Sequence, residues 1–233
     1  MKKLLNLALA TLVAGAAAST QAYETGDLIL RAGVVTVDPD ASSDTIDLGV
    51  EGVPTLEADV DSSTQLSIIP VWMLTESWGL ELLAATPFDH DISVSGGGLN
   101  LDAGKTKQLP PTLTLQWYPR GGQTGWQPYL GIGLNYTLFF SEDVDGELKG
   151  ALNAVLGATD ANLKLDDSFG LSASAGVDIP LGEHWSLNAG LWYIDIDTEA
   201  TLTAKFADGS KAPVKFDVDI DPWVYNFGIA YKF

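Results

Sequence analysis

The sequence predicts an all-β fold, an eight-stranded antiparallel transmembrane β-barrel with short periplasmic turns and long extracellular loops. Three observations predict it. Eight segments alternate apolar and polar residues with a period of two, the connections between them alternate between short and long, and tryptophans gather beside the short connections. The chain has 31 acidic and 12 basic residues and a net charge of −19. This balance argues against nucleic acid as a partner, because phosphate binding needs clustered Lys and Arg.

Residues 1–22 have the three parts of a secretory signal peptide. Lys2 and Lys3 form a positive start, an apolar stretch follows, and Thr20, Gln21 and Ala22 form a small-x-small cleavage site. We expect cleavage near Ala22, which leaves residues 23–233 as the barrel. A membrane anchor is the less favoured alternative, because the apolar stretch is short. No later stretch offers the roughly 20 consecutive apolar residues that a membrane helix needs.

The alternating segments follow one another along the mature chain. They lie near residues 27–37, 64–74, 78–88, 110–119, 127–139, 168–179, 185–206 and 212–233. The last segment alternates most sharply and ends on the aromatic Phe233. Its phase changes at Asp221–Pro222, which predicts a bulge or bend there, with the upper parts of the last two strands above the membrane. A soluble sandwich would alternate equally well, so the connections decide.

The connections favour a barrel in the bacterial outer membrane. Those at 75–77, 120–126 and 180–184 are short, whereas those at 38–63, 89–109 and 141–167 are long and acidic, with one helix expected over 146–157. The aromatic residues beside the short turns fit a periplasmic interface girdle: Trp78, Trp117, Tyr118, Trp126 and Trp185. The expected surroundings are outer-membrane lipid and lipopolysaccharide, and we expect a monomer.

Six strings stand at the predicted strand positions. They are GDLILRAGVVTVDP at the mature start, ELLAATPF at 81–88, LPPTLTLQWY at 109–118, PYLGIGLNYTLFF at 128–140, WYIDIDT at 192–198 and DPWVYNFGIAYKF at the end. In this order they resemble the OmpW/AlkL family of small outer-membrane barrels. The resemblance implies a barrel that helps small, mostly hydrophobic molecules cross the outer membrane passively, with no cofactor. The Asp-rich loops depart from the family, so what they recognise stays open.

The polar face of each strand should point into the lumen if the apolar face meets lipid. Near the periplasmic end this inward set is polar: Arg31, Glu81, Gln116, Tyr118, Ser174, Asp178, Ser186, Asn188 and Lys232. Eight strands enclose a space just wide enough for side chains. We therefore expect a lumen floor formed by Arg31, Glu81, Gln116 and Asn188, with Arg31 and Glu81 as an ion pair and no water pore.

Towards the outside the inward set becomes apolar: Val35, Val37, Ile69, Leu83, Pro87, Phe139, Trp192, Ile194 and Ile196. An apolar cluster that opens to water favours a hydrophobic ligand, because burial of apolar surface is worth about 25 cal/mol per Å². The family resemblance suggests that Leu83 and Trp192 form the constriction of a hydrophobic funnel. The channel residues are then Leu83, Trp192, Val35, Ile69, Phe139 and Ile194. The alternative is that these side chains only fill a small barrel.

A hydrophobic solute would lose several kcal/mol of favourable burial if it crossed the polar floor into water, so we expect it to leave sideways. A lateral opening needs missing ladder hydrogen bonds, and proline has no N–H to donate. Pro87, Pro110 and Pro111 therefore mark the expected opening, with Pro70 as a further break. The alternative for Pro110 and Pro111 is that they only end the second long loop.

Two other functions remain open. One is a narrow pore for small polar solutes such as amino acids, which would use the inward Ser, Asn and Gly groups. The other is a structural or adhesive barrel that acts through its loops.

Enzymatic and metal chemistry are not expected. His90 has Asp89, Asp91 and Ser93 beside it, but near neighbours on one extended segment rarely assemble a catalytic triad. The chain has no cysteine, and its loop aspartates lack the spacing of an EF-hand, so we predict neither a cofactor nor a specific metal site. The loop aspartates are Asp38, Asp40, Asp44, Asp47, Asp59, Asp61, Asp143, Asp145, Asp160, Asp166 and Asp167.

Overall fold

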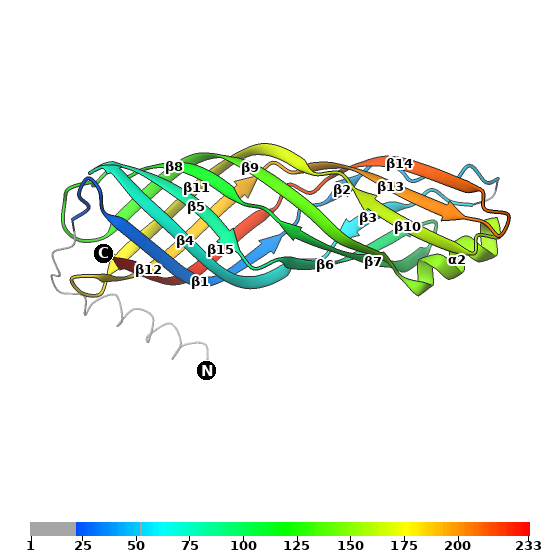
Figure 1. Cartoon of the computed structure of the whole chain (residues 1–233), viewed down its shortest axis with the longest axis horizontal. Helices are drawn as coiled ribbons and strands as arrows, with labels where there is room; N and C mark the ends of the chain where they lie inside the picture. The colour runs from blue at the N-terminus through cyan, green and yellow to red at the C-terminus, as the bar shows by residue number, and fades with distance from the viewer. Residues whose placement is uncertain (1–21, 52) are drawn as a thin grey trace.

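The computed structural model describes residues 22–51 and 53–233, and the expected signal peptide lies outside this part except for Ala22. The elements form one long cylinder (Figure 1). In chain order they are β1 (Leu28–Asp38), β2 (Ser42–Ser43), β3 (Glu57–Val60), β4 (Ser63–Thr75), β5 (Trp78–Ala85), β6 (Phe88–Gly96), β7 (Leu99–Leu109), β8 (Thr112–Trp117), β9 (Gln127–Val144), α2 (Gly146–Leu156), β10 (Asp160–Leu165), β11 (Ser168–Pro180), β12 (Trp185–Ile194), β13 (Asp197–Lys205), β14 (Lys211–Asp219) and β15 (Trp223–Lys232).

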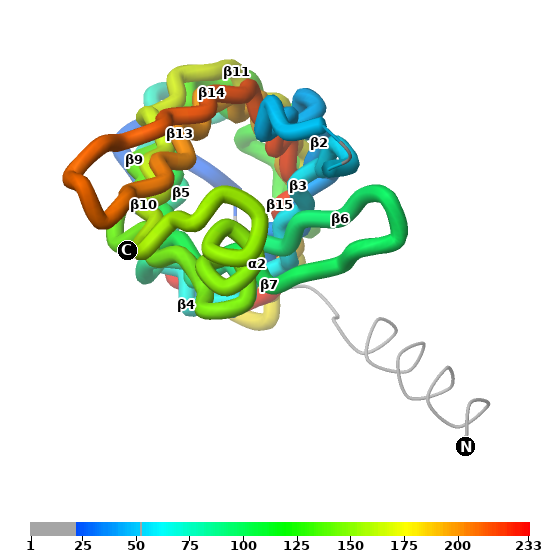
Figure 2. The backbone as a smooth tube through the Cα atoms, turned by 90° about the vertical axis from the view of Figure 1, so that its right-hand side faces the viewer, coloured from blue at the N-terminus to red at the C-terminus, as the bar shows by residue number. Residues whose placement is uncertain are grey.

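Eight strands close into a ring at the end of the cylinder that carries the short turns. We call this end the lower end and the end with α2 the upper end. Their order is β1, β4, β5, β8, β9, β11, β12 and β15, and β15 pairs again with β1. Every pairing in the ring is antiparallel. β9 pairs with β8 on one side and with β11 on the other, where Asn135 lies opposite Gly170. The view along the axis shows the ring (Figure 2). The predicted eight-stranded barrel is confirmed.

The outer surface of this ring is apolar. Its exposed residues include Ile132 at 71% and Phe227 at 64%, each on the face opposite the lumen. The tryptophans near the short turns, Trp78, Trp117, Trp126 and Trp185, are also exposed. Tyr118 is different: its side chain is fully buried. Its assignment to the girdle is therefore wrong, and its place in the inward set is right.

The long connections contain regular structure, which corrects the prediction of loops there. Residues 89–109 form most of the β6–β7 hairpin, which continues the wall upwards, and β3 pairs with β6. A second sheet, β10–β13–β14–β2, stands above the ring. Phe88, Ile92 and Val94 alternate with charged and polar residues. The outward side of these strands is acidic and polar instead of apolar, and this composition disguised the strand pattern.

The predicted bend and the predicted helix are both confirmed. β14 ends at Asp219 and β15 begins at Trp223, and between them Asp221 has a φ of 37°, a left-handed conformation. Asp145 caps α2 by accepting a hydrogen bond from the Glu147 N–H at 3.0 Å, and Gly157 ends the helix with a φ of 73°. No helix in the described residues is long and apolar enough to span a bilayer.

Candidate functional site

The lower interior is a buried charge network centred on Arg31. Its Nη1 lies 2.6 Å from Oε2 of Glu81 and its Nη2 lies 2.6 Å from Oδ2 of Asp178. The Arg31 Nε also donates to Asp178 Oδ1 at 3.2 Å, so the guanidinium binds Asp178 with two parallel hydrogen bonds. All three side chains are fully buried. Strands β1, β5 and β11 supply them, so the network joins the wall across the lumen.

Neutral side chains donate further hydrogen bonds to the carboxylate oxygens that Arg31 contacts. Gln116 donates to Glu81 Oε2 at 2.6 Å, and Asn188 donates to Asp178 Oδ1 at 2.8 Å. Tyr23 donates to Asp178 Oδ2 at 2.8 Å. The ring of Tyr129 lies under the guanidinium, with its centroid 4.4 Å from the Arg31 Cζ. The groups are mutually paired and fully buried, so they fill the barrel interior at this level.

The structure thus brings together the four predicted floor residues Arg31, Glu81, Gln116 and Asn188, including the expected ion pair. Asp178 belonged to the inward set, but its contact with Arg31 was not predicted. Tyr129 was missed, although it shares the parity of the inward residues of its strand. Tyr23 was also missed because it precedes the first alternating segment, where no periodicity could place it.

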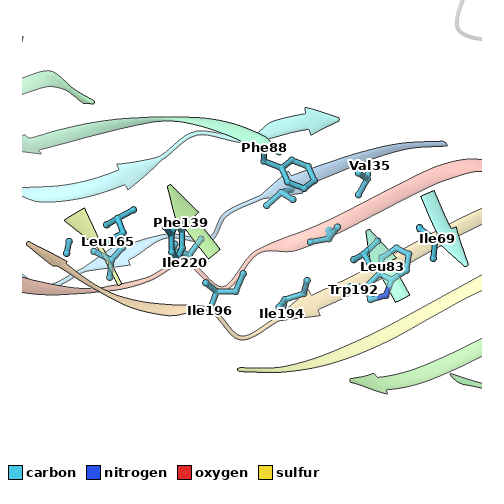
Figure 3. Packing of buried hydrophobic residues seen from close by; sticks show 14 residues of the cluster. Val35, Ile69, Leu83, Phe88, Phe139, Leu165, Trp192, Ile194, Ile196 and Ile220 are labelled. Atoms are coloured by element: carbon cyan, nitrogen blue, oxygen red, sulfur yellow. The ribbon is translucent and has the colours of Figure 1, made fainter. Parts of the chain in front are cut away.

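Trp192 joins the floor to the apolar interior above it. Its side chain is fully buried, and its indole Nε1 donates to Glu81 Oε1 at 3.1 Å. A Cβ atom at Gly190 would lie 2.5 Å from Trp192 Cη2, so only glycine lets the indole lie flat against β12. Leu83 belongs to the same buried apolar cluster and is drawn near Trp192 in the close view (Figure 3). The sequence-predicted pair therefore lies in one cluster of the lumen.

The apolar region forms a column above Trp192, which we call the funnel. It contains the predicted Val35, Val37, Ile69, Leu83, Phe139, Ile194 and Ile196, together with Phe88, Leu165, Ala200, Val218, Ile220 and Val224. These side chains follow one another along the axis (Figure 3). Pro87 is exposed, which corrects its assignment to the inward set. Phe88 is buried instead, because the chain shifts phase between β5 and β6 and turns the next residue inwards.

A cavity of about 160 Å³ runs from the funnel into the wall. On the inner side it is lined by Val35, Val37, Leu83, Phe88, Ile194 and Val224, and on the wall side by Ala84, Ala85, Leu109, Pro110, Pro111 and Leu138. Pro110 and Pro111 therefore lie where the lateral opening was predicted, whereas Pro87 does not line the cavity. The lining is almost entirely apolar, so the cavity suits a hydrophobic occupant.

The strand ladder is interrupted at this cavity. Within the described residues, the β5–β8 register ends at Leu83 with Thr112, and the β6–β7 register begins at Phe88 with Gln108. Pro110 and Pro111 stand in the interval and have no N–H to donate. The opposite side of these residues stays joined to β9, where the Tyr136 N–H donates to the Pro111 carbonyl at 3.1 Å. The ladder is therefore interrupted on one side of these prolines only.

The residues weighed for catalysis and metal binding do not come together. Both ring nitrogens of His90 contact groups other than a serine hydroxyl, the Asp61 carbonyl and the Gln108 amide. Three carboxylates that could share a metal ion, Asp195, Asp197 and Asp221, lie at the bend, and none was among the loop aspartates considered from the sequence. The absence of enzymatic activity and of a metal site stays a prediction.

The closed ring, its apolar outer surface and its buried floor define an integral outer-membrane β-barrel. The chain matches the OmpW family over residues 24–233, and it belongs to that family. It is 44% identical to outer membrane protein W of Vibrio cholerae, over 97% of each chain. It is 39% identical to outer membrane protein W of Escherichia coli, over the whole of both chains.

A solved structure extends this likeness to the fold. The crystal structure of the outer membrane protein OprG from Pseudomonas aeruginosa superposes with a TM-score of 0.80 at 43% identity, covering 92% of this chain and 99% of that one. The resemblance seen in the six strand strings and the predicted location in the outer membrane are therefore confirmed.

Proposed function

We propose that this barrel carries small hydrophobic molecules from the outside into the outer membrane by passive diffusion. The molecule enters the funnel, stops at Trp192, and leaves sideways through the wall cavity between the ends of β5 and β7. The observation that carries the proposal is the position of this cavity, which connects the funnel to prolines in an interrupted ladder.

The energetics favour this lateral route over the axial one. The floor holds three buried charged side chains that pair with one another, and a solute passing through it would have to separate them. Breaking a buried ion pair by removing one partner costs about 3–5 kcal/mol, and an apolar molecule offers no compensating hydrogen bonds. A molecule that moves sideways exchanges apolar side chains for lipid, so it stays in apolar surroundings throughout.

The proposal is tested by filling the cavity from its inner side. Leu83→Trp should reduce uptake of a labelled n-alkane into vesicles by about tenfold. The larger indole would fill the cavity, so a solute would have to force its way between packed side chains at a cost of about 1–3 kcal/mol. Leu82→Trp is the matched control, since Leu82 is the next residue of β5 and is 40% exposed on the lipid face. Equal uptake by the two variants would contradict the proposal.

One observation favours the second function considered from the sequence, a narrow pore for small polar solutes. The hydroxyls of Thr114, Ser172 and Ser174 are buried without a hydrogen-bond partner in the described residues, and they surround Gly131 and Gly133 inside β8, β9 and β11. Such a strip can bind water or a small polar molecule beside the floor. A liposome-swelling assay with glycine separates the two functions, because only a polar pore admits glycine.

A further inference from the structure

A second apolar chamber lies above the funnel, outside the membrane-spanning ring. Its volume is about 60 Å³, and it is lined by buried residues of β3, β6, β7, β10, β13, β14 and α2. Leu148 and Leu152 of α2 are buried in its apolar cluster, and in the view along the axis α2 lies within the outline of the ring (Figure 2). Phe139, Leu165, Val218 and Ile220 line this chamber and also belong to the funnel, so the chamber adjoins the upper end of the funnel.

Four polar side chains interrupt the apolar lining of this chamber. One of them, Thr198 on β13, donates to the Asp166 carbonyl oxygen at 2.6 Å. The other three stand together, His90 on β6 and Thr106 and Gln108 on β7, which are 2%, 4% and 1% exposed. His90 stands directly opposite Thr106 in the β6–β7 register. No charged side chain lines the chamber, so its polar character comes from this group and from the hydroxyl of Thr198, which already has a partner.

The hydrogen bonds within this group fix its orientation. The His90 Nδ1 lies 2.6 Å from the carbonyl oxygen of Asp61, which can only accept, so Nδ1 carries the proton. Burial lowers the pKa of His90, which keeps the ring neutral and leaves Nε2 as an acceptor. The Gln108 Nε2 lies 2.8 Å from the His90 Nε2 and therefore donates to it. The other end of the amide, Gln108 Oε1, is left as an acceptor.

Two atoms of the group lack a partner within the described part of the chain. They are Gln108 Oε1 and Thr106 Oγ1, both buried. A buried acceptor without a donor is unfavourable, and native proteins satisfy such atoms with water or a ligand. The carbonyl oxygen needs a donor, whereas the threonine hydroxyl can give or take a hydrogen bond.

We propose that the upper chamber is a binding site for small apolar molecules that carry one hydroxyl group. The ligand hydroxyl donates to Gln108 Oε1 and accepts from Thr106 Oγ1, while its hydrocarbon part lies among the side chains under α2. A carboxylate is disfavoured, because it has no proton for Gln108 Oε1 and meets no cation in the lining. This inference rests on the proposed function, in which apolar molecules enter from above. It names the chemical class of the molecules that bind in the upper chamber before they reach the funnel.

The experiment measures binding without transport. The full barrel in lipid nanodiscs is titrated at neutral pH with n-hexanol, n-hexane and hexanoate, and binding is followed by NMR shifts of the β6, β7 and α2 amides. We expect n-hexanol to bind about two- to tenfold more tightly than n-hexane, the effect of one or two uncharged hydrogen bonds. Hexanoate should bind most weakly.

Three variants assign the preference to the two unpartnered atoms. Gln108→Leu and Thr106→Val should each reduce the preference for n-hexanol over n-hexane towards one, with n-hexane binding retained. Thr106→Val replaces an unpartnered hydroxyl with a methyl group, whereas Gln108→Leu also removes the donor to His90 Nε2, so thermal unfolding checks that both variants fold. Thr137→Val is the matched control, because Thr137 is equally buried but its hydroxyl donates to Asn135 Oδ1 at 2.7 Å.

The possible results separate this inference from the proposed function. Equal binding of n-hexanol and n-hexane, or a preference that survives both variants, would overturn the hydroxyl site and leave water as the partner of these atoms. A hydroxyl preference that Gln108→Leu abolishes, found together with alkane uptake that Leu83→Trp leaves unchanged, would support the site and overturn only the transport route.

Discussion

The floor and the funnel occupy the same barrel and face the same lumen, but they are built in opposite ways. In the floor, Arg31 joins Glu81 and Asp178 with both contacts at 2.6 Å, and neutral donors complete the network. In the funnel, apolar side chains leave a cavity of about 160 Å³ that reaches the wall. Strand parity decides which residues face inwards, and their chemistry decides whether that level is filled by paired polar groups or leaves an apolar cavity.

The largest effect is expected when the floor loses its cation. Arg31→Met leaves Glu81 and Asp178 buried and unpaired, which should lower the free energy of unfolding by about 3–5 kcal/mol. Urea unfolding in lipid vesicles measures the change. Lys105→Met is the control, because Lys105 pairs with Asp91 at 2.8 Å while its side chain is 68% exposed. If both variants unfolded at the same urea concentration, the buried Arg31 network would contribute no more to stability than the exposed pair of Lys105 and Asp91.

The next effect tests the junction between the two regions. Trp192→Phe removes the donor to Glu81 Oε1, and a hydrogen bond to a charged group is worth about 1.5–3 kcal/mol. We expect a loss of that size in the free energy of unfolding, measured as above. Trp185→Phe, at a tryptophan that is 48% exposed beside a short turn, should change much less. If Trp192→Phe left the free energy of unfolding unchanged, the hydrogen bond between Trp192 and Glu81 would not couple the funnel to the floor.

A smaller effect is expected at the helix above the upper chamber. Asp145→Ala removes the N-cap of α2 and should weaken this helix by about 1 kcal/mol. Amide hydrogen exchange at Leu148 and Leu152 measures the change, which should be absent from the ring strands. Asp143→Ala is the control, since Asp143 is exposed on β9 and does not cap the helix. Unchanged exchange in Asp145→Ala would show that packing alone holds α2.

The smallest effect is a pH dependence carried by His90. Burial lowers its pKa more than Asp61, Asp89 and Asp91 raise it. The unfolded chain therefore binds a proton first as the pH falls below about 6.5, and stability decreases until the pH passes the lower pKa of the folded state. Thermal unfolding of the wild type should show this decrease and His90→Gln should lose it, whereas His184→Gln should keep it. A decrease of the same size in His90→Gln would assign it to carboxylates.

The ring was predictable from the sequence, because every strand in it meets lipid on one face and the lumen on the other. The floor residues followed from parity, which explains why Arg31 and Glu81 could be paired across 50 positions. Parity could not predict that Arg31 would bind Asp178 through two parallel hydrogen bonds, because that depends on the lengths and conformations of the side chains. It also failed at Pro87, where the phase shift between β5 and β6 turns Phe88 inwards.

The upper part of the molecule was not predictable in the same way. On the outer face of the β6–β7 hairpin, the exposed Asp89 and Asp91 alternate with buried residues and give the segment the composition of a loop. The pairing of His90 with Gln108 and the free Gln108 Oε1 depend on the register of this hairpin. No local pattern in the sequence indicates that register.

The central claim is that molecules leave through the wall and not along the axis. The chain has no cysteine, so Ala85→Cys creates a single thiol at the wall cavity, which a bulky thiol reagent can fill. The matched variant Ala173→Cys places the same label on the exposed lipid face of β11. In vesicles, the account predicts that labelling Ala85→Cys stops n-alkane uptake, that labelling Ala173→Cys does not, and that neither protein carries a steady ion current. Continued uptake through labelled Ala85→Cys, or a steady axial current, would contradict it.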